Sequence, residues 1–201
     1  MLPRRKSKLQ RFALLMTALF FCLSMGGSFV SAAPEPELSR RSTIPDLMLI
    51  TQDGQNVRLR SELMKGRVAA ISFIFTTCPS ICRSIGVNLE QLQTELGPSL
   101  GKEISLISIT IDPEKDTPEE LKKWGKQFNA GAGWSLLTGT KRDIDQLLKK
   151  LEVFTSDIQT HTPFMLIVDD RTGQWTRVNV LATPPPKIAE MLRKLARGDH
   201  E

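Results

Sequence analysis

RVAAISFIFTTCPSIC, at residues 67–82, joins an apolar segment to two cysteines that are four positions apart. The run 67–75 is almost entirely apolar, β-branched or aromatic, which predicts a strand that is covered on both faces near the centre of a parallel or mixed sheet. A helix over 79–96 is expected to follow, because Gly97-Pro98 ends its pattern. The stretch therefore predicts a buried strand that leads directly into a helix at the cysteines.

Strands and helices are expected to alternate around this stretch. A hairpin precedes it, with strands at 47–50 and 57–59 around the turn pair Asp53-Gly54, followed by a helical turn at 61–64. The later strands are expected at 103–111, 134–137, 163–168 and 174–180. The later helices are expected at 118–128, with a Thr117 to Glu120 capping box, at 140–151 and from 183 to about 197. This order predicts an α/β fold with a central mixed sheet flanked by helices and an N-terminal β-hairpin.

The net charge of +5 comes from the N-terminal end of the chain. Residues 1–33 contain five basic residues and no acidic one, and the rest of the chain has 22 basic and 22 acidic residues. An apolar run at 12–30 and the small residues Ser31-Ala32-Ala33 follow the basic stretch, which is typical of an export signal. If it is not cleaved, the same segment is long enough to anchor the chain in a membrane. The neutral remainder lacks the charge and the motifs of a nucleic-acid-binding protein.

We therefore divide the chain into a signal peptide or membrane anchor at 1–33, a linker at 34–43 and one domain at 44–198. The domain is expected to be exported, either periplasmic or facing the periplasm from the anchor. Cys22 lies in the signal, so the domain has two cysteines, Cys78 and Cys82, and only one histidine, His161, apart from His200 in the tail. An oxidising compartment allows these cysteines to form a disulfide.

The two cysteines favour chemistry that depends on sulfur. Cys78 lies where backbone N–H groups and the helix dipole stabilise a thiolate, so we expect it to be more acidic and more exposed than Cys82. Their spacing allows a disulfide or the joint binding of one soft metal ion. A purely stabilising disulfide is disfavoured because so short a loop removes little chain entropy, and a structural zinc site needs four ligands.

His161 is the one further soft ligand that the domain offers. A lone histidine is more often structural, but His161 precedes an expected strand and could approach the two sulfurs from a neighbouring strand. Thr162-Pro163 favours extended backbone and is a candidate cis peptide bond. Asp112 and Asp116 are interpreted as carboxylates that cap the following helix and favour its dipole.

Four features together resemble the Sco/SenC proteins. They are FTTCPSIC at 75–82 after a buried strand, SITIDPEKDTP at 108–118, LTGT at 137–140 before a helix, and a histidine ahead of the last expected hairpin. The resemblance covers about residues 42–197 and implies a thioredoxin-like fold with one copper ion bound by Cys78, Cys82 and His161. It also implies a role in assembling the dinuclear copper site of cytochrome c oxidase, with the copper-bearing subunit or another copper-handling protein as partner. Arg83 and Gln159-Thr160 depart from the usual family pattern but leave this ligand set intact.

Two functions remain open on the sequence. In the first, the chain is a copper chaperone, which is favoured because two thiolates and an imidazole suit a soft metal. In the second, it is a thiol-disulfide oxidoreductase with Cys78 and Cys82 as the catalytic redox pair and no obligatory metal. An exported domain with an inert disulfide is a third interpretation.

Overall fold

The apolar run after Arg67 forms the central strand β4 (Val68–Ile74), and all seven of its residues are buried. β4 pairs in parallel with β5 (Ile104–Thr110) and antiparallel with β7 (Phe164–Asp169). β5 is also buried along its whole length. A strand with neighbours on both edges and covered faces favours apolar side chains, which explains its largely apolar composition.

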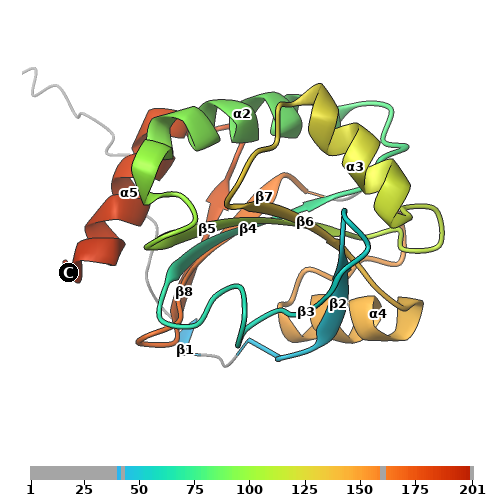
Figure 1. Cartoon of the computed structure of the whole chain (residues 1–201), viewed down its shortest axis with the longest axis horizontal. Coiled ribbons are helices and arrows are strands. Elements are labelled where there is room, and N and C mark those ends of the chain that lie inside the picture. The colour runs from blue at the N-terminus through green and yellow to red at the C-terminus, as the bar shows by residue number, and fades with distance from the viewer. Residues whose placement is uncertain (1–39, 42–43, 159–161, 200–201) are drawn as a thin grey trace, which may run out of the picture. The chain divides into compact units, whose positions relative to one another are not determined.

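The computed structural model describes residues 40–41, 44–158 and 162–199, which form one eight-stranded mixed sheet with helices on both faces (Figure 1). The strand order is β1-β8-β7-β4-β5-β6-β2-β3. The strands not yet introduced are β1 (Arg40–Arg41), β2 (Met48–Thr51), β3 (Asn56–Arg58), β6 (Trp134–Thr138) and β8 (Gln174–Asn179). The predicted α/β fold with a central mixed sheet is confirmed, and so is the N-terminal hairpin, since β2 and β3 pair antiparallel.

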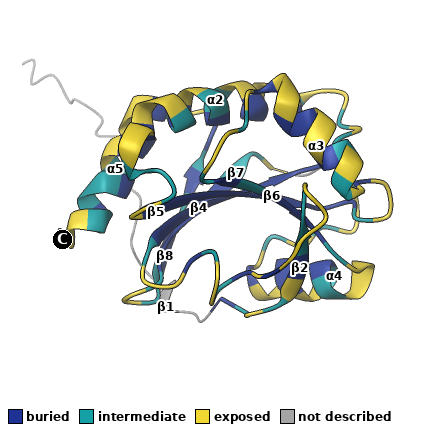
Figure 2. Cartoon of the chain, in the orientation of Figure 1, coloured by how far each residue is buried: buried dark blue, intermediate teal, exposed yellow. Residues whose placement is uncertain are grey.

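The helices of the described residues lie on both faces of the sheet (Figure 1). Helices α2 (Ile81–Leu96), α3 (Pro118–Gln127) and α5 (Pro185–Arg197) lie on the first face, and α4 (Lys141–Lys150) lies on the second. α2 and α3 share a face because they connect successive parallel strands, from β4 to β5 and from β5 to β6, with the same hand. Buried residues are found along the sheet and on the inner sides of the helices (Figure 2).

A close contact holds α2 against the end of α3. A Cβ atom on Gly86 would lie only 2.5 Å from ring atoms of Phe128, so the two helices approach where α2 has no side chain. Glu90 accepts a hydrogen bond from the side chain of Asn129 at 2.5 Å, and the side chain of Gln93 donates to the carbonyl oxygen of Asn129 at 2.9 Å. These contacts fix the helix that begins at the cysteines.

Several local expectations need correction. Residues 59–66 form turns, and the N–H of Met64 donates to Arg60 O at 3.1 Å, so the helical turn expected at 61–64 is present but does not continue as a regular helix. α2 begins at Ile81, two residues later than expected, and a short 3-10 helix, η1 (Gly97–Ser99), follows it. The described peptide bonds are all trans, including that between Thr162 and Pro163, so the candidate cis bond is not found.

The expected capping box of α3 is half formed. The Thr117 side chain accepts a hydrogen bond from the N–H of Glu120 at 3.3 Å, as predicted. The carboxylate of Glu120 instead pairs with Lys123 at 2.6 Å, and the N–H of Thr117 donates to Lys115 O at 3.0 Å. Thr117 therefore caps the helix without the reciprocal bond.

The chain divides between residues 35 and 36 into two units, and the first unit lies outside the described residues. The signal or anchor at 1–33 and the linker at 34–43 therefore stay predictions. Of that linker, Arg40 and Arg41 are described and form β1, which pairs with β8. No helix in the described part of the chain is long and apolar enough to span a membrane.

Candidate functional site

The two cysteines lie at the junction between β4 and α2. Cys78 is half-buried in the connecting turn, and Cys82, in the first turn of α2, is 1% exposed. Both are free thiols, and the N–H of Cys82 donates a hydrogen bond to Sγ of Cys78 at 3.4 Å. The helix start therefore directs a backbone donor at the more accessible sulfur, as the sequence predicts.

The surroundings of Cys78 favour its thiolate. Burial is the largest single influence and opposes ionisation, but hydrogen bonds from the Cys82 thiol, from Ser80 and from the N–H of Cys82 outweigh it together. The pKa of Cys78 is therefore lower than that of an ordinary cysteine. A more acidic and partly exposed sulfur can act as a nucleophile or as the first ligand of a metal.

The surroundings of Cys82 have the opposite effect. Burial raises the pKa of Cys82 to about 12, and its hydrogen bond to Cys78 and the negative charges of Cys78 and Asp116 act in the same direction. Cys82 therefore remains a neutral thiol until a metal ion or another base takes its proton. The expected order of acidity, with Cys78 more acidic than Cys82, is confirmed.

A buried carboxylate lies behind the cysteine turn. Asp116 is 0% exposed and accepts hydrogen bonds from the side chains of Thr76 and Thr110 at 2.6 and 2.5 Å. Burial raises the pKa of Asp116 above the usual value, and the hydrogen bonds from the two threonines oppose this effect. The interpretation of Asp116 as a helix cap is wrong, because its carboxylate binds the turn after β4 and the end of β5.

Asp112 also differs from its expected role. Its carboxylate lies 3.3 Å from the ammonium group of Lys115, and its backbone oxygen accepts hydrogen bonds from the N–H groups of Lys115 and Asp116. The side chain that caps α3 is that of Thr117. The capping interpretation is therefore wrong for Asp112 as well.

His161 lies outside the described residues, so its position relative to the sulfurs stays a prediction. The residues after it are described: the N–H of Phe164 donates to Thr162 O at 2.8 Å, and the N–H of Val180 donates to Pro163 O at 2.9 Å. Ser72 near the end of β4 pairs with Met165 near the start of β7. The start of β7 and the cysteine turn are therefore at the same end of the sheet.

No group of three His, Cys, Asp or Glu side chains that could hold a metal ion is found within residues 40–41, 44–158 and 162–199. The described residues bring together two sulfurs and no third ligand of these types. Thiolates suit a soft metal ion, and such a site is completed by a ligand from elsewhere. In the ligand set predicted from the sequence, this third ligand is His161.

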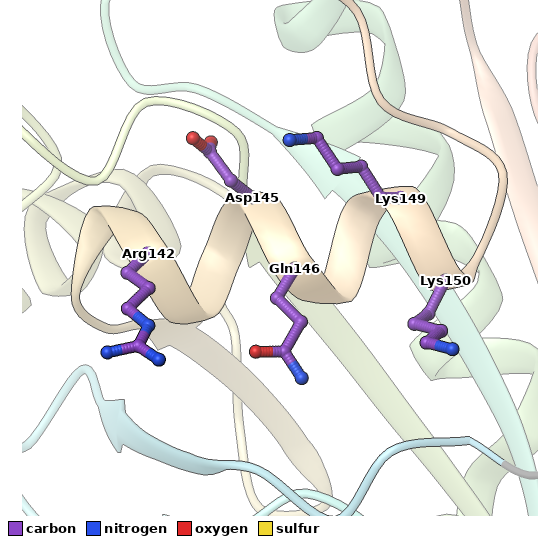
Figure 3. A pocket seen from close by; sticks show the side chains of 5 residues that line it. All are labelled: Arg142, Asp145, Gln146, Lys149 and Lys150. Carbon is purple, nitrogen blue, oxygen red and sulfur yellow. The ribbon is translucent and has the colours of Figure 1, made fainter.

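Three hollows on the described surface are lined by residues other than the cysteines. One of about 590 Å³ runs along α4 and is lined by Arg142, Asp145, Gln146, Lys149 and Lys150 (Figure 3). Two smaller hollows, of about 240 and 200 Å³, share Arg60 and Asp170 near the start of β4 and the end of β7. None of these three hollows is lined by Cys78 or Cys82.

The threonines that bind Asp116 were not predicted from the sequence. Thr76 lies in the turn after β4 and Thr110 is the last residue of β5, and a hydroxyl at such a position indicates a polar partner nearby. That signal does not identify Asp116 as the partner, because it lies 40 residues after Thr76.

Comparison with known proteins agrees with this geometry. The model of the SCO1/SenC family matches residues 35–197. An SCO2-like protein of Rickettsia conorii is 31% identical over 161 residues, which are 74% of this chain and 74% of that protein. The SCO1 protein homolog of Bacillus subtilis is 36% identical over 101 residues, 49% of this chain and 51% of the relative. A Stutzerimonas stutzeri protein with copper binding in its name is 34% identical over 114 residues, 57% of this chain and 54% of the relative, so the chain spans about half the length of these two proteins.

Solved structures show the same fold. BsSco, described with a disulfide switch and as a member of the Sco family of cytochrome c oxidase assembly proteins, has a TM-score of 0.68 and 25% identity, covering 81% of this chain and 98% of that one. Copper-bound ScoI of Bradyrhizobium japonicum has a TM-score of 0.63 and 23% identity, covering 81% and 99%. The thioredoxin-like fold implied by the sequence is confirmed. The chain belongs to the SCO1/SenC family.

Proposed function

We propose that this chain is an exported copper chaperone that binds copper through Cys78, Cys82 and His161 and helps assemble the copper site of cytochrome c oxidase. The observation that carries the proposal is the pair of free thiols at the start of α2, one accessible and one buried, joined through the hydrogen bond from Cys82 N–H to Cys78 Sγ at 3.4 Å. Two sulfurs, one just before α2 and one in its first turn, form with an imidazole a soft ligand set that suits Cu(I).

The sheet register supports His161 as the third ligand. His161 precedes the first residue of β7, Phe164, by three positions, and three residues span at most about 10 Å. The start of β7 is next to the end of β4, from which the cysteine turn departs. A histidine three residues before Phe164 can reach that end of the sheet, which supports the proposal that His161 is the third ligand.

The family supports the choice of copper. Relatives include a protein named for copper binding and a solved ScoI with copper bound, and BsSco is described as a cytochrome c oxidase assembly protein. The proposed partner is the copper-bearing subunit of the oxidase or another copper-handling protein. Cys78, the more accessible sulfur, is the ligand that a partner would reach first.

The site is proposed to face the periplasm. The support is the N-terminal sequence, where a basic stretch, an apolar run and Ser31-Ala32-Ala33 follow the order of an export signal. Mass spectrometry of the protein recovered from cells tests this. A chain that begins near Pro34 supports cleavage, an intact chain in the membrane fraction supports an anchor, and an intact chain in the cytoplasm contradicts export.

A thiol-disulfide oxidoreductase is the second candidate, and the unequal acidity of the two cysteines favours it. The Cys78 thiolate would attack a target disulfide, form a mixed disulfide and release one target thiolate. Cys82, after losing its proton, would attack the Cys78 sulfur and release the second target thiolate. Two electrons pass to the target, and the domain is left with a Cys78–Cys82 disulfide.

An anaerobic Cu(I) competition titration separates the two candidates. We expect His161→Ala and Cys82→Ser each to lower the affinity for Cu(I) by at least about tenfold, because each removes one ligand. His200→Ala is the matched control, since it removes the only other histidine, and it should bind as the parent does. Cu(I) affinity unchanged in His161→Ala, together with rapid disulfide reduction by the parent, would establish the oxidoreductase instead.

A further inference from the structure

A fully buried carboxylate, that of Asp116, connects the cysteine turn to the end of β5. Its Oδ1 accepts hydrogen bonds from the Thr76 N–H at 3.1 Å and from the Thr76 hydroxyl at 2.6 Å. Its Oδ2 accepts from the same N–H at 3.2 Å and from the Thr110 hydroxyl at 2.5 Å. One side chain thus accepts from donors in the turn after β4 and at the last residue of β5.

The stability of α3 does not explain why a carboxylate is buried here. Thr117 caps that helix, so the side chain of Asp116 is not needed for this purpose. A buried charge is costly unless it is paired or hydrogen-bonded, and Asp116 accepts hydrogen bonds from neutral groups of Thr76 and Thr110. These hydrogen bonds offset the cost, and they tie the carboxylate to the turn that follows β4.

The segment that it holds leads to the accessible sulfur. Thr76 is two residues before Cys78, and the N–H of Cys78 donates to Phe75 O at 3.3 Å, which closes the turn. On the other side, the N–H of Cys82 donates to Cys78 Sγ at 3.4 Å. The turn is therefore fixed by Asp116 at its start and by α2 at its end, with the Cys78 sulfur between them.

We propose that Asp116 is a positioning residue for Cys78: by binding both donors of Thr76, it holds the turn so that the Cys78 sulfur stays at the start of α2. The use of this sulfur for copper or for thiol exchange rests on the proposed function. The positioning itself does not, because it concerns the folded domain without metal.

Positioning and simple electrostatics predict opposite results. If Asp116 acts by holding the turn, its loss moves the Cys78 sulfur away from the donors of α2 and makes the thiol less acidic. If Asp116 acts only through its negative charge, neutralising it favours the thiolate, and the thiol becomes more acidic. Removing the Thr76 hydroxyl while keeping the charge affects the first mechanism alone.

The test is the pH profile of alkylation of Cys78 in the reduced, metal-free protein, followed by mass spectrometry. We expect the midpoint to rise by about one pH unit in Asp116→Asn and also to rise in Thr76→Val. Ser105→Ala is the control, because it removes a buried hydrogen bond to Leu63 O at 2.6 Å at the start of β5 and should leave the midpoint unchanged. Thr76→Ser keeps both donors and should restore the parent profile.

A lower midpoint in Asp116→Asn, or an unchanged midpoint in both Asp116→Asn and Thr76→Val, would overturn the proposal. If Asp116→Asn does not fold, the comparison of Thr76→Val with Thr76→Ser decides alone, since both keep the carboxylate. Because no copper is present, failure of the chaperone proposal leaves this result intact. Conversely, Asp116→Asn and Thr76→Val could show the parent's alkylation profile while His161→Ala loses Cu(I) binding. That result would exclude only the positioning role of Asp116 and leave the proposed function standing.

Discussion

The carboxylates at the two ends of the central strands have different partners. At the start of β4 and the end of β7, Asp170 pairs with Arg60 at 2.6 Å and Asp169 pairs with Arg171 at 2.8 Å. At the other end, where β4 leads into the cysteine turn, Asp116 accepts hydrogen bonds from two threonines, and the nearby sulfurs of Cys78 and Cys82 are free thiols. One end neutralises its charges, whereas the other holds a buried carboxylate and a reactive thiol close together.

This difference indicates what each end contributes. Paired charges at the first end fix the loops before β4 and after β7, so we expect them to affect stability and not thiol chemistry. The cysteine end has groups whose ionisation is shifted, namely Cys78, Cys82 and Asp116. Shifted ionisation is common at functional sites, and it makes this end sensitive to pH.

The largest expected effect is alkaline destabilisation through Cys82. Its pKa is raised in the folded protein to about 12 from 9.0, so the stability that its neutral thiol contributes is complete below about pH 9. That stability is lost as the pH rises through about 12, and the loss is up to about 4 kcal/mol. Urea unfolding of the reduced protein between pH 8 and about pH 11 should show a steeper decline for the parent than for Cys82→Ser. Equal slopes for the two proteins would contradict the shifted thiol.

A smaller effect is expected at the paired end. Asp170→Ala removes the partner of Arg60 and the acceptor of the Gly66 N–H, which lies 3.0 Å from the carboxylate. We expect the free energy of unfolding to fall by about 2 kcal/mol, measured by urea denaturation at neutral pH. The Cys78 alkylation profile should not change. A shifted profile would show that the two ends are coupled, which would break the distinction between them.

The smallest effect is expected for Thr110→Val at the cysteine end. This change removes one hydrogen bond to Asp116 and the acceptor of the Asp112 N–H, at 2.9 Å, but leaves the bonds from Thr76. Urea denaturation should show a loss of about 1 kcal/mol, less than for Asp170→Ala. A loss larger than that of Asp170→Ala would mean that the Asp116 network stabilises the fold more than the ion pairs do.

The fold could be predicted largely from local pattern. The apolar run at 67–75 and the Asp53-Gly54 turn indicated the central strand and the hairpin, because buried strands and tight turns constrain residue type directly. The single helical turn expected at 61–64 is present as a hydrogen-bonded turn that does not extend into a regular helix, because so few residues cannot propagate one. The short strand β1 was not predicted, since its pairing with β8 joins segments more than 130 residues apart in sequence, as in Arg40 with Trp175.

The candidate site was predictable only in part. The spacing of Cys78 and Cys82 and their position at a helix start gave the order of acidity. The role of Asp116 could not be predicted, because a carboxylate just before a capped helix has the same local sequence whether it caps the helix or turns inward. Only the three-dimensional contact with Thr76 distinguishes the two. The approach of Gly86 to Phe128 was missed for the same reason.

The central claim is that two sulfurs and one imidazole nitrogen hold the metal. X-ray absorption spectroscopy of the Cu(I)-loaded protein tests this most directly, with His161→Ala alongside. We expect two sulfur ligands and one nitrogen ligand in the parent, and the loss of the nitrogen in His161→Ala with both sulfurs retained. Sulfur ligands alone in the parent, or an unchanged nitrogen ligand in the variant, would contradict it.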